Sequence, residues 1–154
     1  MKVYLFKVKL YHNKRIWRTI AIKENQTLAD FHDVIFEAFD RYDAHLYSFY
    51  LTDGSKRRDR FRNCPEFTDP INIQEKRKMG FGRIPENAEK TAVRDLNLSI
   101  KDKFEYLFDF GDNWLHEIVL EKIEGVNPKT TYPSIIKKNG DSPDQYPDYD
   151  DEEF

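Results

Sequence analysis

Apolar side chains at every second position mark the first two segments of the chain as strands. Along residues 3–10, one face carries only aromatic and aliphatic side chains, whereas the other face includes two lysines. This alternation is typical of a strand with one buried side. A polar turn, His12-Asn13-Lys14, separates it from residues 16–22, where isoleucines recur on one face. We therefore predict a hairpin of two strands.

The apolar spacing changes to three and four residues after Thr27, which predicts a helix. Its stripe consists of Leu28, Phe31, Ile35 and Phe39. Thr27 can cap the first turn, and Asp30 stands where a capping box needs an acceptor. We expect the helix to end between Phe39 and Tyr42.

The segments that follow the helix are mixed in character. Residues 45–51 alternate again, which predicts a strand, and Asp53-Gly54 predicts a turn after it. Residues 63–92 contain three prolines and two glycines. Such residues interrupt regular structure, so we expect a long loop or insertion there with at most short elements.

A second hairpin is predicted near the end of the chain. Alternation in residues 104–108 and 114–123 flanks Gly111-Asp112-Asn113, and those three residue types favour a tight turn. Beyond Pro133 we expect a loop and then a mobile, acid-rich tail over 139–154.

The order of these elements predicts the fold class. Two strands, a helix, a strand, a loop and two more strands favour an α+β domain with a mostly antiparallel or mixed sheet and one main helix packed on it, a β-grasp-like arrangement. The chain has 154 residues, which fits a single domain. We place this domain at 1–138, with a basic insertion at about 55–92.

Charge is unevenly distributed. The chain has 25 basic and 28 acidic residues, and seven of the acidic ones lie in the tail, so the body carries 25 against 21. No apolar run reaches the roughly 20 residues of a membrane span, and lysines interrupt the N-terminus where a signal peptide would be apolar. We expect a cytoplasmic protein with no membrane partner, in which the single cysteine, Cys64, is an ordinary loop thiol.

Four blocks of sequence resemble the plasmid pRiA4b ORF-3-like family, whose members are often described as passenger proteins of mobile elements. The blocks are residues 16–18, 27–35, 45–49 and 106–118, and the most specific is Asp109-Phe110-Gly111-Asp112-Asn113-Trp114-Leu115-His116. The chain departs from the family at Tyr42, where a tryptophan is usual. The resemblance implies a defined domain but no established reaction.

A candidate polar site lies within these blocks. It comprises His32, His45, Asp109, Asp112, Trp114 and His116. Histidine is the commonest metal ligand and the usual general base, so one hypothesis is a divalent metal held by His32, His45 and His116 in a metal-assisted hydrolase or nuclease. The spacing matches no known zinc motif. The alternative is a set of half-buried structural histidines, with the aspartates organising the turn and Trp114 filling the core.

A second candidate is a nucleic-acid site in the basic insertion. Its cations are Lys56, Arg57, Arg58, Arg60, Arg62, Lys76, Arg77 and Lys78. Clustered cations neutralise phosphates, and the neighbouring Phe61 and Phe81 can stack on bases. The alternative is a solvated charged loop, which the overall pI of about 5.8 favours.

No complete catalytic constellation is present, since the sequence holds neither a phosphate-binding glycine loop nor a Gly-x-Ser-x-Gly elbow. Our leading hypothesis is therefore a non-enzymatic binding or accessory module linked to mobile elements, with an unknown protein or nucleic-acid partner. The metal-assisted hydrolase is the first alternative, and direct nucleic-acid binding is the second. The acidic tail can serve a basic partner, fold onto the basic insertion, or act only as a solubilising end.

Overall fold

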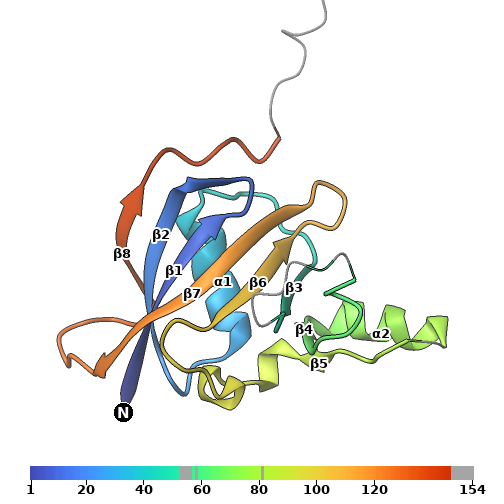
Figure 1. The fold of residues 1–154 in the computed structure, drawn as a ribbon, viewed down its shortest axis with the longest axis horizontal. Helices are drawn as coiled ribbons and strands as arrows, with labels where there is room; N and C mark the ends of the chain where they lie inside the picture. The colour runs from blue at the N-terminus through green and yellow to red at the C-terminus, as the bar shows by residue number, and fades with distance from the viewer. Residues whose placement is uncertain (53–56, 58, 81, 147–154) are drawn as a thin grey trace, which may run out of the picture.

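A computed structural model describes residues 1–52, 57, 59–80 and 82–146. Within these residues, one sheet of eight strands runs in the order β5-β4-β3-β6-β7-β1-β2-β8, with helix α1 against one face (Figure 1). All neighbouring pairs are antiparallel except β4 and β5. The strands are β1 Lys2–Leu10, β2 Asn13–Lys23, β3 Tyr47–Tyr50, β4 Glu66–Thr68, β5 Glu86–Asn87, β6 Lys103–Phe108, β7 Trp114–Gly125 and β8 Ser134–Asn139. The α+β prediction is confirmed.

Helix α1, Leu28–Ala38, forms as predicted because its signals are local. The Thr27 hydroxyl accepts from the Asp30 backbone N–H, and the Asp30 carboxylate accepts from the Thr27 N–H in return. The apolar stripe packs on the sheet, where the Phe31 ring stacks 4.9 Å from Phe6 and 5.6 Å from Phe49. This aromatic core fixes the helix across the central strands.

The prediction for residues 63–92 was wrong in one respect, because this region contains a full helix. Helix α2, Pro70–Met79, begins after Asp69, whose carboxylate accepts from the Asn72 N–H at 3.1 Å, and ends at Gly80 with φ of 74°. A capping aspartate, a proline in the first turn and a left-handed glycine are ordinary helix boundaries. Strands β4 and β5 and the 3-10 turn Ala88–Lys90 (η1) complete the region, and a second 3-10 turn, Val93–Leu96 (η2), follows it.

Replacing Asp69 with alanine should destabilise α2. Loss of an N-cap side chain costs about 1 kcal/mol, and little burial compensates, since only Asn72 and Ile73 of α2 are buried. Amide hydrogen exchange of α2 is the measurement, and Asp69→Asn, which keeps the acceptor, is the control. Equal exchange in both variants would contradict the capping role.

The loop expected after Pro133 is instead an edge strand. Strand β8 pairs antiparallel with β2, from Ala21 opposite Ser134 to Trp17 opposite Asn139. The chain then turns at Gly140 and runs back over the end of α1, so that residues 140–146 contact the body. The predicted turn at Asp53-Gly54 and the acidic residues of 147–154 lie outside the described residues. None of the described helices has the length and apolarity needed to cross a membrane.

Candidate functional site

The six residues of the predicted polar site gather near one end of the sheet, but they do not act as one group. His32 lies on α1, His45 lies just before β3, and the other four belong to the β6–β7 hairpin. Tyr106 of β6 pairs with His116 of β7 and contacts two of the histidine rings, at 5.9 Å for His32 and 5.2 Å for His116. Each histidine has its own set of partners.

His32 is a neutral hydrogen-bond acceptor. Its Nδ1 lies 2.6 Å from the Tyr106 hydroxyl, and its ring stacks on Tyr47 at 3.7 Å and 6°. Burial lowers the pKa of His32 to about 4 and raises the pKa of Tyr106 well above its usual value. The phenol therefore stays protonated and donates a hydrogen bond to the His32 ring nitrogen. His32 is thus a neutral part of the aromatic core.

His116 is also neutral, and it is buried with 1% of its surface exposed. Its Nδ1 lies 3.3 Å from the Tyr106 carbonyl, which can only accept, so this nitrogen carries the proton. Burial, together with the charge of Arg41, lowers the pKa of His116 to about 3. The other nitrogen, Nε2, is enclosed and has no hydrogen-bond partner in the described part of the chain.

The proposed three-histidine metal site is not assembled. Among the described residues, which include all three histidines, no group of three or more His, Cys, Asp or Glu side chains could hold a metal ion. His32 and His116 direct ring nitrogens at Tyr106, whereas His45 faces the C-terminal segment. The sequence pattern placed these residues at one end of the fold but could not show their different partners.

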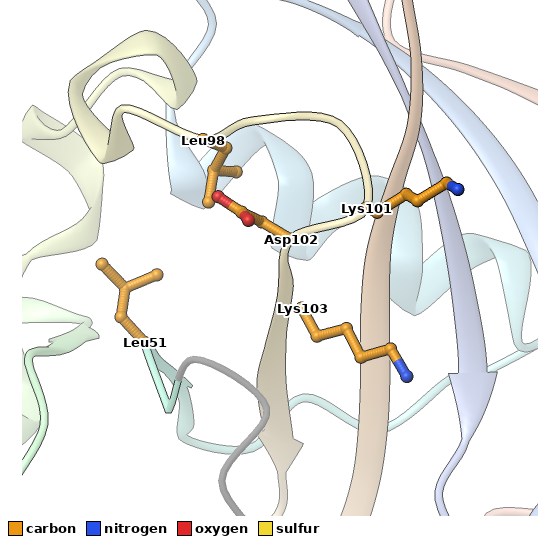
Figure 2. A pocket seen from close by; sticks show the side chains of 5 residues that line it. All are labelled: Leu51, Leu98, Lys101, Asp102 and Lys103. Atoms are coloured by element: carbon orange, nitrogen blue, oxygen red, sulfur yellow. The ribbon is translucent and has the colours of Figure 1, made fainter.

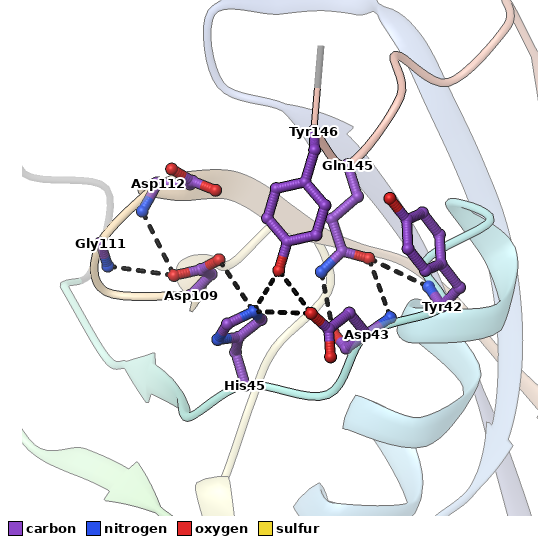
Figure 3. A network of polar contacts seen from close by, with 8 residues as sticks. All are labelled: Tyr42, Asp43, His45, Asp109, Gly111, Asp112, Gln145 and Tyr146. Atoms are coloured by element: carbon purple, nitrogen blue, oxygen red, sulfur yellow. Dashed lines mark hydrogen bonds and ion pairs between the residues drawn. The ribbon is translucent and has the colours of Figure 1, made fainter. Parts of the chain in front are cut away.

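His45 belongs to an exposed network that holds the end of the described chain (Figure 3). Its Nε2 lies 2.6 Å from the Tyr146 hydroxyl and 3.4 Å from an Asp109 carboxylate oxygen. The Tyr146 hydroxyl donates to Asp43 at 2.6 Å, and this hydrogen bond raises the pKa of Tyr146 to about 12. These contacts fasten Tyr146 to the loop between α1 and β3.

The two aspartates of the motif have different roles. Asp109 adopts a φ of 64°, and its carboxylate accepts from the N–H groups of Gly111 and Asp112 at 3.1 and 3.2 Å. This is the turn-organising role that the sequence left open as an alternative. The side chain of Asp112 is exposed and carries no such contact, while Trp114 lies under the guanidinium of Arg41 at 4.2 Å.

Sequence reasoning missed two buried arginines at this end of the fold. Arg18 shares the β2 face of Ile20 and Ile22, and only 2% of its surface is exposed. It donates to the carbonyls of Ala38, Trp17, Asn139 and Gly140 at 2.8 to 3.1 Å. Its even-numbered position in the alternating strand was a usable signal.

Arg41, after α1, is 6% exposed and donates from Nη1 to the Pro143 carbonyl at 3.0 Å. Gln145 reinforces this attachment, because its amide accepts from the Tyr42 and Asp43 N–H groups and donates to the Asp43 carbonyl. We call residues 140–146 the strap. It covers the end of α1 and the buried Arg41.

The predicted basic cluster is largely neutralised within the described residues. Arg60 pairs with Glu105 at 2.9 Å, Lys76 with Glu66 at 2.6 Å, Lys78 with Glu75 at 3.5 Å and Arg57 with Asp59 at 3.1 Å. Arg77 is exposed on α2. Lys56, Arg58 and Phe81 lie outside the described residues. Part of the cluster therefore has a structural role.

Two parts of the basic insertion nonetheless meet around one groove of about 480 Å³. Phe61, Arg62 and Cys64 border it from one side, and Lys76, Met79, Gly82 and Arg83 border it from α2 and the chain after it. Its floor is aromatic, since the ring of Phe61 lies 4.4 Å from Tyr50. Arg62 and Arg83 form no ion pair in the described part of the chain. This groove combines an aromatic platform with uncompensated cations.

A second pocket, of about 310 Å³, lies between β6 and the loop before it. Figure 2 shows Leu51, Leu98 and Asp102 facing this space, whereas the ammonium groups of Lys101 and Lys103 point away from it. The Asp102 carboxylate already accepts from the Ser99 N–H at 2.8 Å. The pocket therefore presents few polar groups to a ligand.

Comparison with known proteins adds a family and a fold. The sequence model of the family described as plasmid pRiA4b ORF-3-like protein matches residues 2–146. A crystal structure of a protein of unknown function, MM3350 from Methanosarcina mazei Go1, superposes with a TM-score of 0.72 at 24% identity, covering 94% of this chain and 72% of that one. No curated protein matched the sequence.

Proposed function

The chain belongs to the plasmid pRiA4b ORF-3-like family, and within it we propose that this protein is a binding module that takes single-stranded nucleic acid in the groove between Phe61 and α2. The observation that carries the proposal is the meeting of two basic segments of the insertion around an aromatic floor. Such a ligand would suit a protein carried on a mobile element.

The charges of the groove favour an anionic ligand. Three cations, Arg62, Lys76 and Arg83, border it together with one carboxylate, Glu66, which leaves a net charge of +2. Glu66 is occupied by Lys76 and by the Ser48 hydroxyl at 2.6 Å each. Arg62 and Arg83 thus remain for phosphates, and charge-assisted bonds from arginine to phosphate are strong and directional.

The aromatic floor favours bases over a plain anion. Phe61 is half-buried, and its ring packs 4.4 Å from Tyr50 and 4.6 Å from the guanidinium of Arg60. A base would stack on the exposed part of this ring. Stacking and phosphate contact together define single-strand binding without sequence readout. His32 and His116 offer no competing catalytic site, because both are neutral and their ring nitrogens lie against the aromatic core.

The test is fluorescence anisotropy of a short labelled oligothymidylate against the full chain over a range of salt. Each phosphate contact on a single strand contributes about −0.7 to the slope of log affinity against log salt. Two free arginines, each binding one phosphate, therefore predict a slope of about −1.4. Arg62→Ala and Arg83→Ala should each remove about half of that slope. Phe61→Ala should weaken binding about tenfold and leave the slope unchanged, since a stacking contact releases no counterions.

The matched control is Lys129→Ala. Lys129 is exposed on the connection between β7 and β8, far from α2 across the sheet (Figure 1). Its removal changes the net charge by the same amount as the arginine variants and should leave binding unaltered. Absence of binding at low salt, or equal losses in Lys129→Ala and Arg62→Ala, would eliminate the groove as a nucleic-acid site.

A further inference from the structure

The two buried arginines beneath the strap differ in how their donors are used. Arg18 donates from Nε and Nη1 to four backbone carbonyls, and none of its enclosed nitrogens lacks a partner in the described chain. Arg41 has one hydrogen bond, from Nη1 to the Pro143 carbonyl. Its Nε and Nη2 are enclosed and have no partner among the described residues. A buried cation in this condition is costly, because desolvation is not offset.

A third unused donor lies beside Arg41. The indole of Trp114 stacks under the guanidinium at 4.2 Å, and its Nε1–H is also enclosed without a partner in the described chain. Arg41 forms no ion pair there; the titratable groups near it are Tyr106, the exposed Asp40 and the neutral His116. Three N–H-bearing nitrogens of these two stacked side chains are thus enclosed and lack an acceptor in the described chain.

We propose that Arg41 and Trp114 form a binding site for a small carboxylate, which enters beneath the strap in place of the Pro143 carbonyl. The planar fork of a guanidinium matches the two oxygens of a carboxylate, and the indole N–H supplies a third donor. One cation balances one negative charge, so a monoanion fits better than a phosphate. This site is separate from the groove beside α2 and does not depend on the proposed nucleic-acid function.

The strap competes with the ligand in this arrangement. Ser142 donates to the Phe39 carbonyl at 2.9 Å, and this bond holds the strap next to Pro143. Lifting the strap costs this bond and the Gln145 contacts, so the intact chain binds carboxylate weakly. A variant with a more weakly held strap binds carboxylate more tightly, because less free energy is needed to displace the strap.

The experiment uses the indole N–H signals of the ¹⁵N-labelled full chain, which has two tryptophans. Sodium formate is titrated against sodium chloride at equal ionic strength, and Trp17→Phe assigns the signals. The Trp114 signal should shift downfield and saturate with formate but not with chloride. The Trp17 signal should stay in place, since Trp17 lies on β2 under Lys7. Ser142→Ala should lower the formate concentration at half-saturation severalfold.

Arg41→Gln should abolish the saturable shift, and Lys138→Gln, which removes an exposed cation on β8, should preserve it. Should Arg41→Gln fail to fold, Arg41→Lys serves instead, because lysine keeps the charge but loses the fork and should bind formate more weakly. A Trp114 response that is equal in formate and chloride overturns the proposal. A formate response that persists unchanged without Arg41 also overturns it.

Discussion

Acidification from pH 7 to pH 5 is expected to destabilise the folded protein by about 4 kcal/mol. His32 and His116 have pKa values of about 4 and 3 in the folded protein, because burial disfavours their charged forms. In the unfolded chain both ionise near pH 6.5. At pH 5 the solution is about 1.5 pH units below the unfolded pKa, and each unit is worth about 1.36 kcal/mol for each histidine. Each histidine therefore lowers the free energy of unfolding by roughly 2 kcal/mol at pH 5.

The sign follows from proton binding. Between pH 6.5 and the folded pKa values, the unfolded chain binds more protons than the folded one, so stability is full above pH 6.5 and falls as the pH is lowered. Urea unfolding at a series of pH values measures the effect. His116→Gln, which cannot ionise, should show about half of the pH dependence. Stability that stays constant from pH 7 to pH 5 would contradict the neutral, buried state of both rings.

The elements that sequence predicted well are those fixed by local signals. The capping box of Thr27 and Asp30 and the stripe of α1 lie within one segment, and both hairpins have alternating strands around polar turns. Helix α2 was not predicted because it has almost no apolar stripe, although Asp69, Pro70 and Gly80 mark its ends. Strand β8 was not predicted because this edge strand, with its exposed lysines, shows little alternation of apolar and polar residues.

The site was predicted at the level of position but not of role. The motif residues do lie near one another, since Tyr106 and His116 are cross-strand partners and Asp109 forms the turn between their strands. What each histidine bonds to depends on tertiary packing that the motif does not encode. The burial of Arg41 depends on Pro143, about a hundred residues away. Residue spacing alone carries no information about such a contact.

Replacing Arg18 with alanine is expected to cost about 4 kcal/mol of stability. The variant loses charge-assisted hydrogen bonds, and it leaves the buried Ala38 carbonyl and the part-buried Gly140 carbonyl without their donor. Each unsatisfied buried group costs about 1–3 kcal/mol, and breaking the contacts of a buried charge adds to this. It also frees the start of the strap. Urea unfolding measures the loss, and limited proteolysis under native conditions reports whether residues 140–146 become accessible.

Arg15→Ala is the matched control for this change. Arg15 lies on the same strand, and its side chain is exposed, so the substitution should alter stability by less than about 0.5 kcal/mol and leave the strap protected. Arg18→Lys should recover part of the loss, because one ammonium can reach some but not all of the carbonyls. If Arg18→Ala and Arg15→Ala proved equally stable, Arg18 would not hold the strap, and the covering of Arg41 would rest on the contacts of Ser142, Gln145 and Tyr146.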